Sequence, residues 1–163
     1  MENENREWKE VRLGDVCDLI TGFAFKSEEY STDKGELRVV RGDNVTEGYI
    51  RWEEKTRYWN NSIIGLEKYL LKENDILIGM DGSKVGKNRA LVRKKQLPLI
   101  LAQRVACIRA KEEVDQKFVA YNVICDRFLK YVDSIKTGTS IPHISGTQIK
   151  DYKIKLPPLP EQK

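Results

Sequence analysis

The chain has 163 residues, of which 40% are hydrophobic and 33% are charged, and its formal net charge is +4. A chain of this length buries enough surface to fold as one domain without a disulfide or a structural metal. It holds no run of 18 apolar residues, and its first ten residues, MENENREWKE, are too polar for a signal peptide. We therefore predict a cytoplasmic protein that does not associate with membranes.

Cysteine and histidine, the residues that most often bind transition metals, are few and scattered. The three cysteines are Cys17, Cys107 and Cys125, and the one histidine is His143. Metal sites use closely spaced pairs of these residues, which this chain lacks. We predict no metal or other cofactor, and three thiols that stay reduced and act as small apolar side chains.

Short elements separated by turns are predicted in the first half of the chain. The pattern favours a short helix around Leu13–Cys17 and then a glycine-containing loop, TGFAFKS, at residues 21–27. A strand at Leu37–Arg41 should end at the turn Gly42-Asp43-Asn44. A second short strand is predicted at Tyr49–Trp52, a helical turn or loop at Gly65–Leu71, and a buried strand at Asp75–Ile78.

The second half predicts two further strands, Asn88–Arg93 and Ala102–Arg109, joined around Pro98. One long helix is predicted from about Asp115 to Asp133, because Phe118, Tyr121, Cys125, Phe128 and Val132 recur at helical spacing as a core-facing stripe. A polar loop (136–143), a short helix (Gly146–Lys150) and a strand (Tyr152–Leu156) follow. The fold class is α+β, with a curled mixed or antiparallel sheet in one domain spanning residues 1–163.

Positive charge is concentrated between Gly82 and Lys111. This segment has nine of the 29 basic residues and no acidic residue, so the rest of the chain has a net charge of −5. A basic zone on an acidic body is typical of a surface that binds a polyanion. A solvated lysine-rich hairpin explains the charge equally well.

Motifs of the common catalytic sites are absent. The segment Gly82–Lys87 has three residues between its glycines where a P-loop has four, and Asn88 stands where a P-loop has Ser or Thr. No GxGxxG or GxSxG motif occurs, so His143 is interpreted as a loop residue rather than a catalytic base. The remaining enzyme hypothesis is a Mg²⁺-dependent nuclease that uses Asp43, Glu53 and Lys55, a spacing that is common by chance in charge-rich chains.

Several segments, in order, resemble one target-recognition domain of the specificity subunit of type I restriction–modification systems. The resemblance covers nearly the whole chain. It rests on WKEVRLGD with ITGFAFKS, RVVRGDNV, NDILIGMDGS with AQRVA, and the closing segments KTGTSIPHI and IKLPPLPEQ. Each motif alone is weak, but their order and spacing together are specific.

The resemblance implies a non-catalytic protein that reads one half of a bipartite site in the major groove of double-stranded DNA. Separate modification (methyltransferase) and restriction subunits would methylate adenine and cleave. The family pattern has two recognition domains joined by long spacer helices, whereas this sequence stops at Glu161-Gln162-Lys163, where a spacer helix would begin. A homodimer or a second recognition domain would complete the pair. An alternative is a protein-interaction half-subunit that docks on a methyltransferase.

Candidate DNA-binding residues fall in four loops and at the start of one strand. Lysine and arginine suit phosphates, whereas Arg, Asn and Gln offer the paired groups that base edges require. Phe23 and Phe25 are more typical of core residues than of DNA contacts. The full set is Lys26, Arg41, Asn44, Ser83, Lys84, Lys87, Arg89, Gln103, Arg104, Thr137, Thr139, Ser140 and His143.

Overall fold

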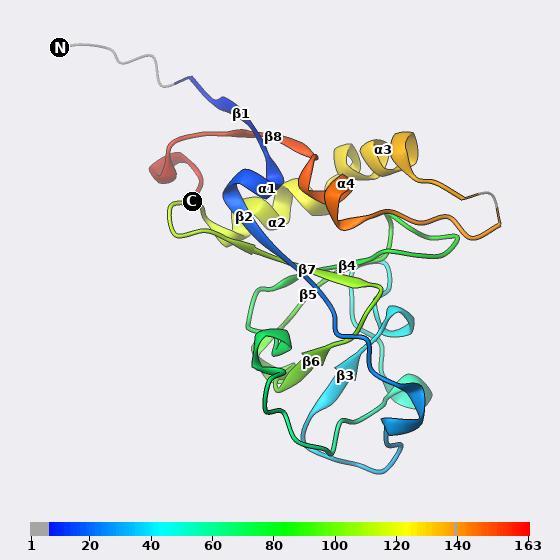
Figure 1. Ribbon diagram of the computed structural model, residues 1–163. Coiled ribbons are helices and arrows are strands. Elements are labelled where there is room, and N and C mark those ends of the chain that lie inside the picture. The colour runs from blue at the N-terminus through cyan, green and yellow to red at the C-terminus, as the bar shows by residue number, and fades with distance from the viewer. Residues whose placement is uncertain (1–6, 139) are drawn as a thin grey trace.

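A four-stranded antiparallel sheet lies at the centre of the computed structural model, which describes residues 7–138 and 140–163 (Figure 1). Its strand order is β2-β7-β4-β5. The strands are β2 (Cys17–Thr21), β4 (Ile76–Gly79), β5 (Arg89–Leu91) and β7 (Val105–Ala110). All four residues of β4 are buried, which explains why its sequence is a continuous apolar run rather than an alternating one.

Alternate residues of the central strands enter two different cores. Ile76, Ile78 and Ile108 pack with the helices on one face. Leu77 and Cys107 point to the opposite face, against a second apolar cluster. This alternation follows from the two-residue period of a strand and divides the protein into layers.

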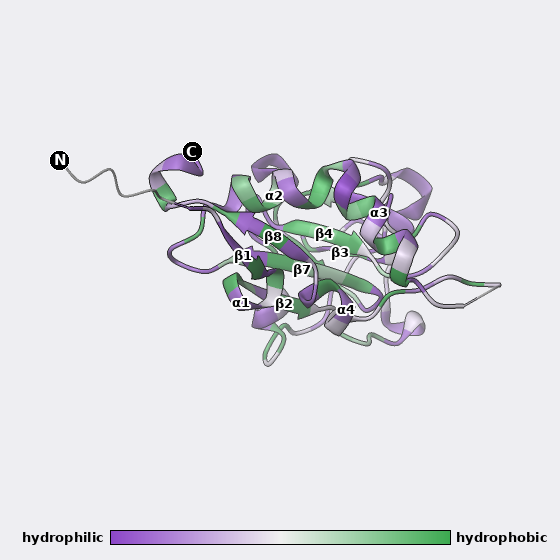
Figure 2. Cartoon of the chain, turned by 90° about the horizontal axis from the view of Figure 1, so that it is seen from above, coloured by the Kyte–Doolittle hydropathy of each residue, from purple (hydrophilic) through white to green (hydrophobic). Residues whose placement is uncertain are grey.

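Helices and a terminal hairpin-like pair cover the first face (Figure 1). The helices are α1 (Leu13–Val16), α2 (Gln116–Ile124), α3 (Asp126–Ile135) and α4 (Gly146–Lys150). Strand β1 (Lys9–Arg12) pairs antiparallel with β8 (Lys153–Leu156), which brings the first and last strands together. Seen from above and coloured by hydropathy, the central strand β4 is hydrophobic, whereas the helices show mixed hydrophilic and hydrophobic surfaces (Figure 2).

The second face packs against a parallel pair, β3 (Arg38–Val40) and β6 (Leu99–Leu101). Val40, Leu99 and Leu101 point to the central sheet, while Val39 and Ile100 point outward into a third cluster with Phe25 and Trp59. Connections around this layer contain short 3-10 helices, at Ser27–Glu29, Gly42–Asn44, Glu53–Lys55, Glu67–Tyr69 and Lys94–Gln96, and a further one follows β8 at Leu159–Glu161.

The α+β class and the antiparallel sheet of short strands are confirmed, but the strands form three sheets rather than one curled sheet. The strand β6 was not predicted, because its apolar residues are too few to show a period. The predicted strand Tyr49–Trp52 is wrong: only an isolated bridge, Val45 to Ile50, forms there. The predicted short helix at Gly146–Lys150 has the observed bounds and begins with a Ser145–Gln148 capping box.

The long helix predicted from Asp115 to Asp133 is instead two helices, because Cys125 adopts an extended conformation (φ −69°, ψ 162°) between α2 and α3. The predicted stripe therefore breaks. Phe128 and Val132 of α3 are buried as expected, but Tyr121 of α2 is 75% exposed. In α2 the core contacts come from Val119 and Val123 instead.

Among the residues that the structure describes, no helix combines the length and apolar character needed to cross a bilayer.

Candidate nucleic-acid interface

A groove of about 880 Å³ opens beside the ends of β4 and β7. Five segments of the chain line it, and each of the four loops predicted to hold DNA-binding residues (21–27, 41–44, 83–89 and 136–143) contributes at least one lining residue. The lining residues are Phe25, Ser27 and Tyr30; Arg41 to Asp43, Val45 to Glu47, Tyr49 and Arg51; Gly79 to Lys84 and Asn88; Ala102 to Arg104; and Ile141. Loops distant in sequence thus converge on one concave surface.

The first segment is held against the sheet by backbone hydrogen bonds. Phe23 N–H donates to the Leu101 carbonyl, and Gln103 N–H donates to the Phe23 carbonyl. Gly22 is required here, since a Cβ at this position would lie 1.9 Å from the carbonyl oxygen of Ala102. Phe25 is buried against Trp59, with ring centroids 4.5 Å apart, so it packs in the third cluster beneath the groove.

A forked ion pair stands on one wall of the groove. Arg104 Nε donates to Asp81 Oδ2 at 2.6 Å, and Nη2 donates to Oδ1. The hydrogen bond from Arg104 lowers the pKa of Asp81. Arg104 has a φ of +65°, in the left-handed region, at the turn that leads into β7. The backbone conformation of Arg104 and two side-chain hydrogen bonds therefore fix the geometry of the ion pair together.

A second ion pair joins two groove loops. Lys84 Nζ lies 2.9 Å from Glu47 Oε1, and both side chains are at least half exposed. The hydrogen bond from Lys84 lowers the pKa of Glu47. Gly48 N–H also donates to the Arg89 carbonyl, which fixes the turn at Gly48 beside β5. Lys84 lines the groove, and in the absence of DNA its ammonium is paired with the carboxylate of Glu47.

Buried hydrogen bonds fix the turn at Arg41–Asn44. Asn44 is fully buried; its Oδ1 accepts from Arg41 N–H, and its Nδ2 donates to the carbonyls of Arg51 and Lys55. Arg41 Nη2 also donates to the Lys55 carbonyl at 2.7 Å, whereas its buried Nε has no partner among the described residues. Asn44 thus has a structural task, while Arg41 lines the groove.

Of the predicted site residues, five line the groove: Arg41, Ser83, Lys84, Gln103 and Arg104. Lys26 and Lys87 are exposed but lie outside its lining. In the 136–143 loop, Thr137 Oγ1 lies 2.9 Å from His143 Nε2, and the backbones of these two residues pair. Ser140 is exposed and Thr139 lies outside the described residues. Only Ile141 of this loop lines the groove.

Two arginines of the basic segment, Arg89 and Arg109, form hydrogen bonds within the protein rather than facing the groove. Arg109 forks onto Asp75 at 2.7 and 2.8 Å, and the side chain of Asp75 is only 3% exposed. Arg89 Nη1 donates to the carbonyls of Val123 and Cys125, and burial lowers the Arg89 pKa. The charge of the segment therefore overstates the number of cations that can face DNA.

Sequence reasoning missed several groove residues, among them Tyr30, Thr46, Tyr49 and Arg51. Tyr49 is 61% exposed and lines the groove. It directly follows Glu47-Gly48, a pair of residues typical of a turn, and this was the signal in the sequence. The prediction of a strand at Tyr49–Trp52 led us to overlook it.

The proposed nuclease residues do not gather at the groove. Asp43 lines it, but Glu53 and Lys55 do not. Within residues 7–138 and 140–163, no three His, Cys, Asp or Glu side chains are grouped so as to hold a metal ion. The geometry gives the nuclease hypothesis no support.

The fold matches solved structures of specificity subunits. A structure described as the "Structural basis underlying complex assembly and conformational transition of the type I R-M system" superposes with a TM-score of 0.70 at 21% identity, covering 99% of this chain and 37% of that chain. The HsdS subunit from Thermoanaerobacter tengcongensis gives a TM-score of 0.67, also at 21% identity, and covers 99% of this chain and 36% of that chain. The fold is therefore the same as that of one part of the HsdS subunit.

The sequence comparisons identify the family. The profile of the type I restriction modification DNA specificity domain matches residues 5–163, and the chain belongs to this family. It is 35% identical to the EcoAI specificity subunit of Escherichia coli, over 95% of this chain and 26% of that protein. It is 29% identical to the MjaVIII specificity subunit of Methanocaldococcus jannaschii, over 96% of this chain and 37% of that protein. The chain spans only about a quarter to two fifths of these relatives.

Proposed function

We propose that residues 1–163 form a non-catalytic DNA target-recognition domain that reads one half of a bipartite site. In this proposal the bound domain directs adenine methylation and cleavage by partner modification and restriction subunits. The observation that carries the proposal is the groove, where five loop segments bring hydrogen-bonding side chains to one surface. Membership of the DNA specificity domain family supports DNA as the ligand of this surface.

The groove chemistry suits base edges. Gln103 and Asn88 each offer a donor and an acceptor on one amide, the pattern that matches adenine. Arg104 offers a planar fork that matches guanine, and the hydroxyls of Ser27 and Thr46 suit phosphate or sugar oxygens. Loops fixed by strand ends keep such groups in place at low entropic cost on binding.

Sequence-independent attraction would come from exposed lysines next to the groove. Lys84 lines it, and Lys87, on the same loop, is exposed. Neutralising phosphates with these lysines releases counterions, so binding should weaken as salt rises. Arg89 and Arg109 are excluded from this role because their guanidinium groups are bound internally.

We propose that the chain acts with a modification subunit and a restriction subunit, paired with a second recognition domain or a second copy of itself. The similar solved structure described in terms of "complex assembly" of a type I R-M system supports an assembly of this kind.

The test is co-expression of the chain with the modification subunit of a type I system in a host without adenine methylation, followed by genome-wide mapping of methylated adenines. We expect methylation at one recurring bipartite motif, which changes or vanishes in a variant with Gln103→Ala. Stable co-purification without motif-specific methylation would support the protein-interaction alternative instead. Plasmid cleavage by the chain with Mg²⁺ alone, lost in Asp43→Ala, would support the nuclease.

A further inference from the structure

Asp81 and Arg104 are held in register by neighbouring strands of the central sheet. Asp81 lies two residues after Gly79, the last residue of β4, and Arg104 directly precedes Val105, the first residue of β7; Gly79 and Val105 are paired in the sheet. Met80 N–H donates to the Arg104 carbonyl at 3.0 Å. The distance between the two residues is thus set by the backbone of the most buried part of the protein.

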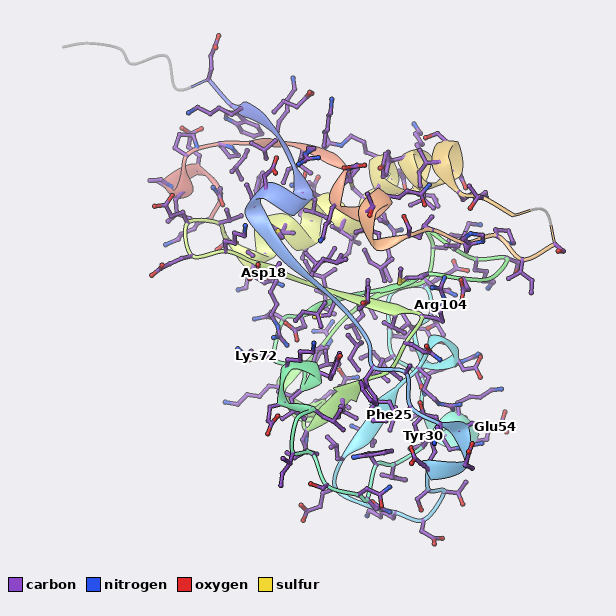
Figure 3. All side chains as sticks on the ribbon, viewed as in Figure 1. Asp18, Phe25, Tyr30, Glu54, Lys72 and Arg104 are labelled. Carbon is purple, nitrogen blue, oxygen red and sulfur yellow. The ribbon has the colours of Figure 1, made fainter. Side chains whose placement is uncertain are left out.

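A second set of backbone contacts holds Asp81 from the other side. Gly82 N–H donates to the Pro142 carbonyl, and Ile144 N–H donates to the Met80 carbonyl, both at 2.9 Å. In Figure 3, Arg104 lies at the right-hand end of the central strands, whereas Asp18 and Lys72 lie toward the left of the view. The carboxylate that receives the Arg104 fork therefore stands on a fixed base at the groove wall.

The fork leaves part of the guanidinium free. A guanidinium has five N–H groups in one plane, and the two bonds to Asp81 use one on Nε and one on Nη2. No other acceptor in the described part of the chain bonds to this group. The Arg104 side chain is 48% exposed and lines the groove, and Asp81 does not use the edge formed by Nη1 and the second N–H of Nη2.

This edge matches one base in particular. Guanine presents two acceptors, N7 and O6, in the major groove, and an arginine with two parallel N–H groups binds both. Because Asp81 already fixes the side chain, little rotamer entropy remains to be lost on binding. We propose, as a refinement of the proposed DNA-reading function, that Arg104 reads a guanine and that Asp81 is the residue that positions it.

The pair's charge distinguishes this role from a phosphate contact. Arg104 and Asp81 together carry no net charge, so their contribution to counterion release is small. Lys84 and Glu47 form the other ion pair of the groove, but an ammonium is a compact point charge without a planar fork. Arg104 should therefore govern which base is bound, while Lys84 governs how strongly any DNA is bound.

The experiment is selection from duplexes with a randomised central segment, at low salt, using the full chain and three variants. Arg104→Lys keeps the charge and the aliphatic stem but removes the fork. Asp81→Ala removes the positioning carboxylate. Glu47→Ala is the matched control, because it removes an acidic residue that is ion-paired in the same groove but does not touch Arg104. Thermal melting confirms that each variant is folded.

We expect the wild-type chain to enrich guanine at one position, with a preference of about 5- to 150-fold over other bases. Arg104→Lys should reduce the guanine preference at that position alone, because an ammonium can still donate to O6 or N7 but lacks the planar fork. Asp81→Ala should lower the guanine preference while it raises affinity for random DNA. Glu47→Ala should raise affinity for random DNA and keep the guanine. Replacing that guanine by 7-deazaguanine, which lacks the N7 acceptor, should weaken binding of the wild type more than binding of Arg104→Lys.

A guanine preference as large in Arg104→Lys as in the wild type would overturn the inference and leave the proposed function intact. Equal weakening for selected and random DNA in Arg104→Lys would also overturn it, since that result indicates a phosphate contact. If the wild type enriches no sequence at all, the reading of DNA by this chain fails, and the role of Arg104 fails with it.

Discussion

Arg89 on β5 donates a hydrogen bond of 2.5 Å from Nη1 to the carbonyl oxygen of Val123, in the last turn of α2. The same nitrogen donates to the Cys125 carbonyl at 3.2 Å, where the chain turns from α2 into α3. The end of a helix leaves carbonyls without intrahelical partners, and a cation there satisfies them and complements the helix dipole. One arginine thus couples the central sheet to the break between the two helices.

We expect Arg89→Ala to lower the free energy of unfolding by about 2 kcal/mol, because it leaves partly buried carbonyls unpaired. Urea denaturation followed by circular dichroism measures this loss. The salt dependence of DNA binding should stay unchanged. Full stability combined with a shallower salt slope would mean that Arg89 contacts phosphate rather than the helix end.

The double variant Lys84→Ala, Lys87→Ala should weaken binding to all DNA sequences alike. Each lost phosphate contact reduces the slope of log K against log salt by about 1, so we expect a decrease of up to about 2. Titrations of a labelled duplex at several salt concentrations give the slope. Lys72→Ala is the control, because Lys72 is exposed and lies outside the groove lining. An equal effect of Lys72→Ala would indicate a general charge effect.

The sequence predicted those elements best whose structure is determined by residues close together in the chain. A short helix was predicted near Gly146–Lys150, and the observed helix there begins with a Ser-to-Gln capping box encoded within four residues. The break at Cys125 was not predicted; the Cys125 carbonyl accepts a hydrogen bond from Arg89, 36 residues earlier in the chain. Helical periodicity continues through Cys125, and only the tertiary contact reveals the change in direction.

The same reasoning applies to the site. The groove loops were predicted from glycines and polar residues at strand ends, and all four of these loops contribute lining residues. The sequence could not separate the arginines that line the groove from those that bond within the core, because both kinds are the same residue type. Arg104 is 48% exposed and pairs with the partly exposed Asp81, whereas Arg109 is 21% exposed and pairs with the buried Asp75.

Asn44→Ala should destabilise the protein more than a typical loop substitution. It leaves the Arg41 N–H and the carbonyl of Arg51 without their buried partner. Each orphaned buried group costs roughly 1–3 kcal/mol, so we expect a loss of about 2–4 kcal/mol. The measurement is the urea midpoint, with exposed Ser83→Ala, expected within about 0.5 kcal/mol of wild type, as the control. A small effect in Asn44→Ala would contradict the structural role assigned to Asn44.

Thiol ionisation should destabilise the protein at high pH. Burial raises the pKa of Cys17 to about 12, and it also raises the pKa of Cys107. An unfolded thiol has a pKa of about 8.5, so the folded state binds more protons above this pH. The stability contributed by the neutral thiols is thus complete below about pH 8.5 and is lost as the pH rises toward 12.

Unfolding midpoints measured between pH 7 and pH 11 test this dependence. In the native protein at pH 8, a thiol reagent should react with Cys125, which is partly exposed, well before the two buried thiols. All three should react in denaturant. Rapid labelling of Cys107 in the native state would contradict the burial that underlies the pH effect.

The most direct test of the account asks which face of the protein touches DNA. Tyr49, which is 61% exposed, lines the groove, whereas Tyr121, which is 75% exposed, lies on α2 outside the groove lining. Photo-cross-linking to duplexes containing 5-iodouracil, followed by digestion and mass spectrometry, locates the contacts. If DNA binds in the groove, we expect adducts on groove segments such as that holding Tyr49, and none on Tyr121. Adducts concentrated on Tyr121, with the groove segments unmodified, would contradict DNA binding in the groove.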